Sequence, residues 1–286
     1  MNRILVILAI LLSSACSDVR SAEINEKDTM RKEFRFADPK ADNRVSVDNV
    51  IGSISATGYQ GDLVELTVHK AIRARSPEKL EKAKSAVSLD ISEENDALEF
   101  YVTGPFRKRD GSVNYHGWRA TGYEVTFDFE LRVPDNTKLV LKTINDGEIN
   151  VKNFRGDYEL DNINGGIEMA DVSGSGHVHT INGDLTIRFK NNPLENSFFG
   201  SLNGAIKLYF QSPLTADFRI KTFNGEAYSD FEVTHIPPKS FTTIERNGKK
   251  IYKSDKTFGV RAGKGGPEIE LDAFNGDIYL FNKDRK

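Results

Sequence analysis

Cysteine is almost absent from this chain, which has one, Cys16, among 286 residues. A single thiol excludes an internal disulfide, so apolar burial and backbone pairing must hold the fold together. No apolar run after the N-terminal one is long enough to cross a bilayer as a helix. The formal charge of −3 predicts no general attraction to nucleic acid or to anionic membranes.

Catalytic patterns are also missing. The sequence has no Ser-His-Asp or Cys-His arrangement, no phosphate-binding loop and no convincing pair of acids. The fractions of hydrophobic residues, 38%, and charged residues, 28%, are those of an ordinary globular domain. We therefore expect a folded protein that is not an enzyme and carries no cofactor.

The N-terminus has the pattern of a secretory signal. Asn2 and Arg3 precede an apolar run over residues 4–12, and small residues follow up to Ala15. We therefore expect a signal peptide over residues 1–15 and an exported mature chain. Cleavage by ordinary signal peptidase after Ala15 or Ala22 would release a soluble secreted protein.

The residues around Cys16 indicate a second outcome. Segment 12–15 (LSSA) before Cys16 resembles the lipobox of bacterial lipoproteins, although Ser13 stands where that motif usually has Leu. The resemblance implies acylation of Cys16 and membrane attachment through an N-terminal lipid. Residues 16–32 would then be the lipidated cysteine and a flexible tether. Ser17 lacks the Asp of an inner-membrane retention signal, so we expect an outer-membrane lipoprotein that faces the periplasm or the cell surface.

The second half of the chain repeats a corner of the form apolar residue, Asn, Gly. Its glycines advance by eighteen residues from Gly147 through Gly165 to Gly183, then by twenty-one to Gly204 and Gly225. Asn-Gly accepts a positive φ with little strain, so we expect left-handed backbone at each corner. The predicted turn residues are Asn164, Gly165, Asn182, Gly183, Asn203, Gly204, Asn224, Gly225, Asn275 and Gly276.

A nearly constant period with alternating apolar residues between the corners predicts stacked short strands. We expect an all-β, single-domain β-solenoid, similar to a parallel β-helix, over residues 33–286. Its first turns would lie at about residues 50–68. Ser76 followed by Pro77 predicts one short helix near the N-terminal end, and residues 232–266 read as a polar insertion.

Several segments together resemble the bacterial putative-adhesin family of unknown function, whose members are secreted or membrane-attached, head-domain-like β-solenoids with Asn-Gly repeats. The resemblance rests on segment 129–134 (FELRVP) leading into 142–149 (KTINDGEI), on 221–225 (KTFNG), and on 265–267 (GGP) before 274–278 (FNGDI). It implies the fold and a surface location, and it supplies no catalytic residues.

Two irregular segments are the best candidates for ligand binding, because binding residues concentrate in loops on a rigid scaffold. The first, 106–122, has aromatic and basic side chains that could stack on a sugar or pair with an anion. The second, 237–266, is locally basic and contains a predicted hairpin turn at Asn247-Gly248. A plain hairpin tip or a solvated ribbon would also account for them. The candidate ligand-binding residues are Arg107, Arg109, Tyr115, His116, Trp118, Lys249 and Lys250.

Other polar patterns favour structural roles. Stacked corner asparagines could bind a glycan, but corner geometry alone accounts for them. Asp157, Asp161 and Asp184 recur near corners without a regular row, and they match a solvated face better than a catalytic one. His177 and His179 have a spacing that zinc could use, but a third ligand is missing. We expect no metal site.

These observations favour a non-catalytic, adhesin-like lipoprotein of the cell envelope that binds a protein or a glycan. An alternative is an envelope-sensing or regulatory accessory of a membrane partner. A polysaccharide lyase or hydrolase is a third and weaker hypothesis. Nucleic acid is not an expected partner.

Overall fold

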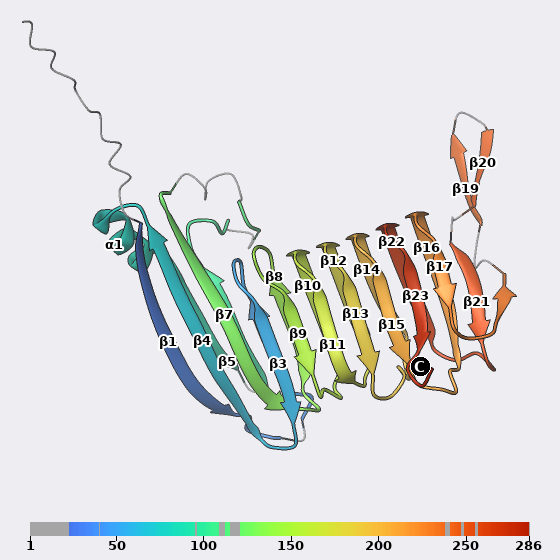
Figure 1. Cartoon of the computed structure of the whole chain (residues 1–286), viewed down its shortest axis with the longest axis horizontal. Helices are drawn as coiled ribbons and strands as arrows, with labels where there is room; N and C mark the ends of the chain where they lie inside the picture. The colour runs from blue at the N-terminus through green and yellow to red at the C-terminus, as the bar shows by residue number, and fades with distance from the viewer. Residues whose placement is uncertain are drawn as a thin grey trace, which may run out of the picture.

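The computed structural model describes residues 23–39, 41–94, 96–108, 112–114, 121–237, 241–246, 249–254 and 257–285. Apart from one short helix, α1 (Pro77–Ala86), the regular structure in these ranges is β-strand. The predicted all-β class and its single helix are confirmed. Two large mixed sheets face each other along the long axis of the molecule (Figure 1). No helix in the described ranges is long and apolar enough to span a membrane.

The first sheet, sheet A, has ten strands. In spatial order they are β1 (Ile24–Arg35), β4 (Leu63–Ala74), β7 (Tyr123–Pro134), β3 (Ile54–Tyr59), β9 (Ile149–Lys152), β11 (Ile167–Val172), β13 (Leu185–Phe189), β15 (Ile206–Phe210), β23 (Ile278–Asn282) and β17 (Ala227–Ser229).

The second sheet, sheet B, has eleven strands. In spatial order they are β18 (Val233–Ile236), β21 (Phe258–Ala262), β16 (Ala216–Asn224), β22 (Glu268–Asn275), β14 (Ser197–Asn203), β12 (Gly176–Asn182), β10 (Tyr158–Asn164), β8 (Lys138–Thr143), β2 (Arg44–Asp48), β6 (Ala97–Thr103) and β5 (Ser88–Glu94). The predicted insertion contributes a separate hairpin of β19 (Phe241–Arg246) and β20 (Lys249–Ser254).

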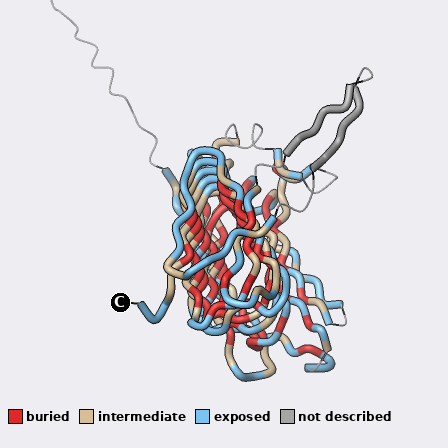
Figure 2. Tube along the Cα trace, turned by 90° about the vertical axis from the view of Figure 1, so that its right-hand side faces the viewer, coloured by how far each residue is buried: buried red, intermediate tan, exposed pale blue. Residues whose placement is uncertain are grey.

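The middle of the molecule is built of layers, each with one strand in sheet B, an Asn-Gly corner, and one strand in sheet A. Strands of successive layers pair in parallel and in register, so that Ile167 lies between Ile149 and Leu185. Side chains at these positions are fully buried. In Figure 2 buried positions, in red, recur along both walls of the stack. Each such side chain stabilises the fold by roughly 1.5–3 kcal/mol. The sheets end in open edge strands and do not close on each other, so the predicted parallel β-helix is not confirmed as a closed coil.

Glycine is required at the corners for a different reason from the predicted one. Left-handed φ values occur at five described glycines, and none of these is a predicted turn glycine. The expectation of positive φ is therefore wrong at the predicted turn glycines, although Asp146 at the first corner has a φ of 52°. Instead, a Cβ on Gly165 would lie 2.0 Å from the carbonyl oxygen of Gly147, and one on Gly204 would lie 2.0 Å from that of Gly183. Adjacent layers approach too closely at the corners for any side chain.

The layers do not stack in the order of the sequence. β22 and β23 form the last layer along the chain, but they lie between the β14–β15 layer and the β16–β17 layer. In register, Asn275 is paired with both Asn203 and Asn224. The corner at Gly225 is therefore the outermost one, although the sequence predicts a simple serial stack.

The N-terminal third has a different architecture. β4 pairs antiparallel with both β1 and β7, so residues 63–68 do not form the parallel turn predicted for them. β1 begins at Ile24, which places residues 24–32 in a strand instead of in the predicted tether. Met30 and Phe34 of this strand pack against the core, and their burial explains why the segment is ordered.

α1 follows β4 and covers this end. Ser76 caps the helix by accepting a hydrogen bond from the Lys79 backbone nitrogen at 3.2 Å, and Pro77 occupies the first turn. Ala83 is its buried residue. The predicted capping pattern is thus confirmed.

Candidate ligand-binding site

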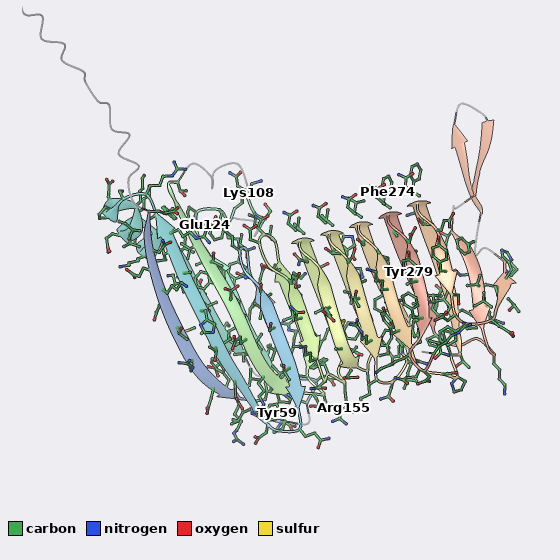
Figure 3. The ribbon with its side chains drawn as sticks, viewed as in Figure 1. Tyr59, Lys108, Glu124, Arg155, Phe274 and Tyr279 are labelled. Carbon is green, nitrogen blue, oxygen red and sulfur yellow. The ribbon has the colours of Figure 1, made fainter. Side chains whose placement is uncertain are left out.

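A polar cleft opens where the antiparallel strands meet the first Asn-Gly layers. Its volume is about 690 Å³, and we call it the N-terminal cleft. In Figure 3 the labelled residue of its wall, Glu124, lies along the same edge of the molecule as Lys108 and Phe274, opposite the edge that carries Tyr59 and Arg155. The described residues that line it are Glu23, Ile51, Arg73, Arg75, Gly122, Tyr123, Glu124, Asn145, Asp146 and Asn164.

Alternation along β4 aims two guanidinium groups toward the same side. Arg73 and Arg75 are both exposed and flank the buried Ala74. Arg73 lies across from Glu124 on β7, with 3.8 Å between Nη1 and Oε1. Arg75 forms no ion pair with any residue that the structure describes. Its guanidinium therefore retains its donors for a ligand.

The opposite wall is the first corner. Asn145 is held by its backbone, which donates from N to the Val50 oxygen at 2.9 Å and accepts from the Gly52 nitrogen at 3.0 Å. Asp146 follows with a left-handed φ of 52° and an exposed side chain. Such a backbone is costly for a residue with a Cβ, although Asp tolerates it better than most. The corner thus presents a carboxylate beside two amides, Asn145 and Asn164.

Tyr123 is a buried residue of the cleft lining. The residue is 7% exposed, and its hydroxyl is buried without a hydrogen-bond partner among the described residues. Burial raises the pKa of this phenol above its ordinary value, so the hydroxyl stays protonated and keeps a donor. A buried hydroxyl without a partner costs about 1–3 kcal/mol.

These groups are suited to recognition through hydrogen bonds. Guanidinium, carboxylate and amide groups bind hydroxyl and carboxylate groups with defined geometry. The lining contains Arg73 and Arg75 against the acids Glu23, Glu124 and Asp146, so the cleft combines both signs of charge.

Arg107, a predicted ligand residue, is used inside the protein. Its side chain is 8% exposed, and Nη2 lies 2.6 Å from Asp48 Oδ1. Nε donates to the Val102 carbonyl at 3.1 Å, and the guanidinium lies 4.5 Å from the centre of the Tyr101 ring. These contacts fasten the base of the 106–122 loop to β2 and β6, and they do not place Arg107 in the cleft.

The other predicted ligand residues cannot be placed in a site. Arg109, Tyr115, His116 and Trp118 lie outside the described residues, as does Cys16. Their loop returns to the fold at Gly122, which lines the N-terminal cleft. Lys249 and Lys250 belong to β20 and pair in register with Arg246 and Glu245, which agrees with the predicted hairpin turn. The structure does not describe their side chains.

The acids weighed as catalytic groups connect neighbouring layers. Asp184 accepts from the Ala205 nitrogen at 2.9 Å and from Lys207 Nζ at 2.8 Å, and the hydrogen bond from Lys207 lowers the pKa of this carboxyl. Asp157 accepts from the Ser175 nitrogen at 3.1 Å. Asp161 lies 3.5 Å from Lys142 Nζ. Each has a structural partner in an adjacent layer.

The histidine pair is also accounted for by packing. The ring of His177 stacks on Phe198 with 4.5 Å between centroids, and the ring of His179 lies 6.4 Å from that of His177. Within the part of the chain that the structure describes, no group of three or more His, Cys, Asp or Glu could hold a metal ion.

Sequence reasoning missed the N-terminal cleft as a site. Its charged residues come from four places far apart in sequence: just before β1, the end of β4, the start of β7 and the corner at Asn145. One signal was available: Arg73-Ala74-Arg75 places two cations on one strand face just before a helix cap. Without the antiparallel register of β4 and β7, the sequence does not show that Glu124 lies across from Arg73.

Comparisons with known proteins leave the family unassigned by sequence. No family model matches the chain, and no curated protein matches it. The fold is similar to a solved "putative cell adhesion protein" from Clostridium sporogenes, at 12% identity and a TM-score of 0.45, covering 90% of this chain and 100% of that one. It is also similar to a "putative adhesin" from Bacteroides fragilis, at 10% identity and a TM-score of 0.42, covering 89% and 97%. A "putative lipid binding protein" from Parabacteroides distasonis gives 11% identity and a TM-score of 0.33, covering 88% and 96%.

Proposed function

We propose that this chain is an exported, non-catalytic, adhesin-like protein that binds a protein or glycan of the cell envelope through the N-terminal cleft. The observation that supports the proposal most directly is the position of the Arg75 guanidinium in a cavity lined by acids and amides. Arg75 lines the cleft together with the exposed Asp146 and Asn164, and its guanidinium forms no ion pair with a described residue. Such groups are stabilised when a polar ligand binds.

The scaffold suits this role. A stack of layers with fully buried side chains holds the Asn145 corner in place, and paired antiparallel strands position Arg73 and Glu124. We infer that the layers with parallel pairing, from β8–β9 to β16–β17, are a two-sheet β-solenoid. Binding groups on a rigid support lose less conformational entropy when the ligand binds.

The N-terminal sequence motivates the proposed location. Cleavage before Cys16 and acylation of its thiol would leave only residues 17–23 as a tether before β1 begins at Ile24. A tether this short would keep the N-terminal cleft close to the membrane. We propose an outer-membrane lipoprotein that faces the periplasm or the cell surface.

The experiment is an affinity pull-down from native membranes with the full-length acylated protein, in which bound proteins and glycans are both identified by mass spectrometry. The double variant Arg75→Ala with Asp146→Asn should lose the partner. The matched control, Lys190→Ala with Glu195→Gln, changes exposed charges outside the cleft lining and should keep it. A partner retained by the cleft variant would refute binding through the cleft.

A Cys16→Ala variant tests the anchor in the same experiment. If capture of one discrete membrane protein depends on Cys16, the envelope-sensing alternative gains support. Recovery of a glycan by both the acylated and unacylated proteins favours the adhesin-like role. Release of the Cys16→Ala protein from the membrane fraction is the result expected for lipid attachment.

A further inference from the structure

The corner asparagines form one continuous chain of side-chain hydrogen bonds. From the second member onward, each Nδ2 donates to the Oδ1 of the preceding layer, over distances of 2.6–2.8 Å. The six members in spatial order are Asn145, Asn164, Asn182, Asn203, Asn275 and Asn224. We call this row the asparagine ladder.

The ladder leaves part of every amide unused. A carboxamide has two N–H donors and an oxygen with two lone pairs. The bonds within the ladder engage one donor and one lone pair of each internal member. Asn164, Asn182, Asn203, Asn224 and Asn275 are exposed, so one donor and one acceptor per layer face outward. They repeat at the spacing of neighbouring strands, about 4.7–4.9 Å.

An apolar row runs beside the ladder, formed by the residue before each asparagine. Its last three members in spatial order are unusually exposed: Leu202 at 41%, Phe274 at 43% and Phe223 at 55%. The rings of Phe274 and Phe223 stack with 4.9 Å between centroids and an angle of 2°. In Figure 3, Phe274 projects outward from this edge of the molecule. Exposed aromatic side chains that share one edge are typical of an interaction surface.

The two rows are uncharged and lead into the N-terminal cleft. Asn145 and Asn164 belong both to the ladder and to the cleft lining. A ligand held in the cleft can therefore continue along the amides toward Phe274 and Phe223 without crossing a charged side chain of either row.

Resting on the proposed function, we propose that the asparagine ladder and its apolar row bind an extended, neutral, β-linked polysaccharide, one sugar unit per layer. Each amide offers one donor and one acceptor, which is the combination that a sugar hydroxyl pair requires. The apolar row supplies contact for the C–H surfaces of the sugar rings.

Periodicity favours a glycan over a peptide. An extended peptide advances about 3.2–3.4 Å per residue, and its side chains on one face recur after two residues. Neither distance matches the strand spacing, so a peptide laid across the layers would lose register after one or two of them. An extended β-1,4-linked pyranose chain turns each unit over relative to the last, so the same ring edge recurs at every second unit and can meet every second layer in register.

The test uses the full-length protein and soluble β-1,4-linked oligomers of glucose and of N-acetylglucosamine, titrated in a calorimeter as dimers, tetramers and hexamers. The affinity should rise with each added unit up to about the number of ladder layers. A double variant, Phe223→Ala with Phe274→Ala, removes the aromatic end and should weaken hexamer binding at least about tenfold while leaving dimer binding unchanged. Leu194→Ala, at an 88% exposed position outside both rows, is the matched control and should change neither.

Three outcomes would overturn the inference. Equal affinity for dimer and hexamer would mean that the site binds no more than two sugar units. Hexamer binding that survives the double variant would place the ligand elsewhere. Absence of binding by every oligomer, while the membrane pull-down still recovers a partner that depends on Arg75 and Asp146, would refute the ladder site and leave the proposed function standing. If the pull-down recovers no partner, the proposed function is refuted, whatever the result with the oligomers.

Discussion

Asn275 donates a hydrogen bond from Nδ2 to the Oδ1 of Asn203 at 2.8 Å, although 72 positions separate the two residues. Asn224 lies between them in sequence, but it donates to Asn275 at 2.7 Å. The last layer along the chain, the inserted layer, therefore lies between two layers that precede it in sequence. The outermost layer, with its Gly225 corner, depends on this inserted layer for its support.

Replacing Gly276 should break this insertion. A Cβ at residue 276 would lie 2.1 Å from the Gly204 carbonyl oxygen, and backbone cannot move aside as a flexible side chain can. We expect Gly276→Ala to lower the free energy of unfolding by about 2–3 kcal/mol. Urea denaturation measures the loss. Hydrogen exchange should also rise in β16 and β17, which rest on the inserted layer.

Gly166→Ala is the matched control for that substitution. The nearest atom to its Cβ would be the Asp184 carbonyl oxygen at 3.1 Å, so a small shift accommodates it. We expect a change of less than about 1 kcal/mol, because the reduced entropy of the unfolded chain offsets the tight contact. Equal losses for the two variants would contradict close approach as the reason for glycine at the corners.

One layer lacks a hydrogen bond that its neighbours have. Thr180 donates from its hydroxyl to the Gly165 carbonyl at 2.8 Å, and Ser201 donates likewise to Gly183 at 3.0 Å. The equivalent residue in the inserted layer is the buried Ala273, which pairs in register with Ser201. Ala273→Ser should place a hydroxyl near the Gly204 carbonyl and stabilise the fold by about 0.5–1.5 kcal/mol.

Thermal unfolding of Ala273→Ser and Ser201→Ala checks this reasoning from both sides. The second variant should destabilise by about 1 kcal/mol, since it removes the hydroxyl that donates to the Gly183 carbonyl. If Ala273→Ser destabilises the protein, the inserted layer has no room for the hydroxyl, and the analogy between layers fails.

The repeat and the helix were predictable because each depends on a local pattern. The alternation of apolar and polar residues predicts which side chains are buried, and Ser76 followed by Pro77 predicts where α1 begins. The stacking order was not predictable, because the corners at Gly225 and Gly276 carry the same signature and either could rest on Gly204. The reason for corner glycine was also hidden, since a clash with Gly147 or Gly183 depends on a neighbour in another layer.

The N-terminal cleft escaped prediction for a related reason. Arg73 and Glu124 face each other only through the antiparallel register of β4 and β7, and sequence spacing does not reveal that register. Arg107 was singled out for its position in an irregular, aromatic-rich loop. The side chain is nevertheless buried against Asp48, and this ion pair fixes the base of the loop. Sequence position alone does not distinguish an anchoring residue at the base of a loop from a ligand residue at its tip.

Arg107 should therefore matter for stability. Arg107→Ala removes the partner of Asp48 and the contact with Tyr101, and we expect a loss of about 2–3 kcal/mol because Asp48 is only partly exposed. Arg107→Lys should recover part of the loss, since lysine keeps the charge but lacks the second donor direction. Chemical denaturation measures both. A fully stable Arg107→Ala protein that has lost its partner would restore Arg107 as a ligand residue.

The carboxylate of Asp217 should make the end of the stack sensitive to acid. Arg261 on β21 donates to it from Nε and Nη2, both at 2.7 Å, and these bonds lower the pKa of Asp217 below its ordinary value. A carboxyl with a lowered folded pKa contributes stability that is complete above its unfolded pKa, about 3.9, and is lost as the pH falls toward the folded pKa. The wild-type protein should thus lose stability below about pH 4, and hydrogen exchange should rise first in β21, which Asp217 fastens to β16.

Asp217→Asn should be less stable at neutral pH and should lose less stability on acidification. Both differences should be modest, because the Arg261 side chain is 43% exposed and screened by solvent. Arg261→Gln should flatten the acid limb in the same way, since it removes the other half of the pair. Parallel stability curves for the wild type and both variants below about pH 4 would show that other carboxylates control the acid response.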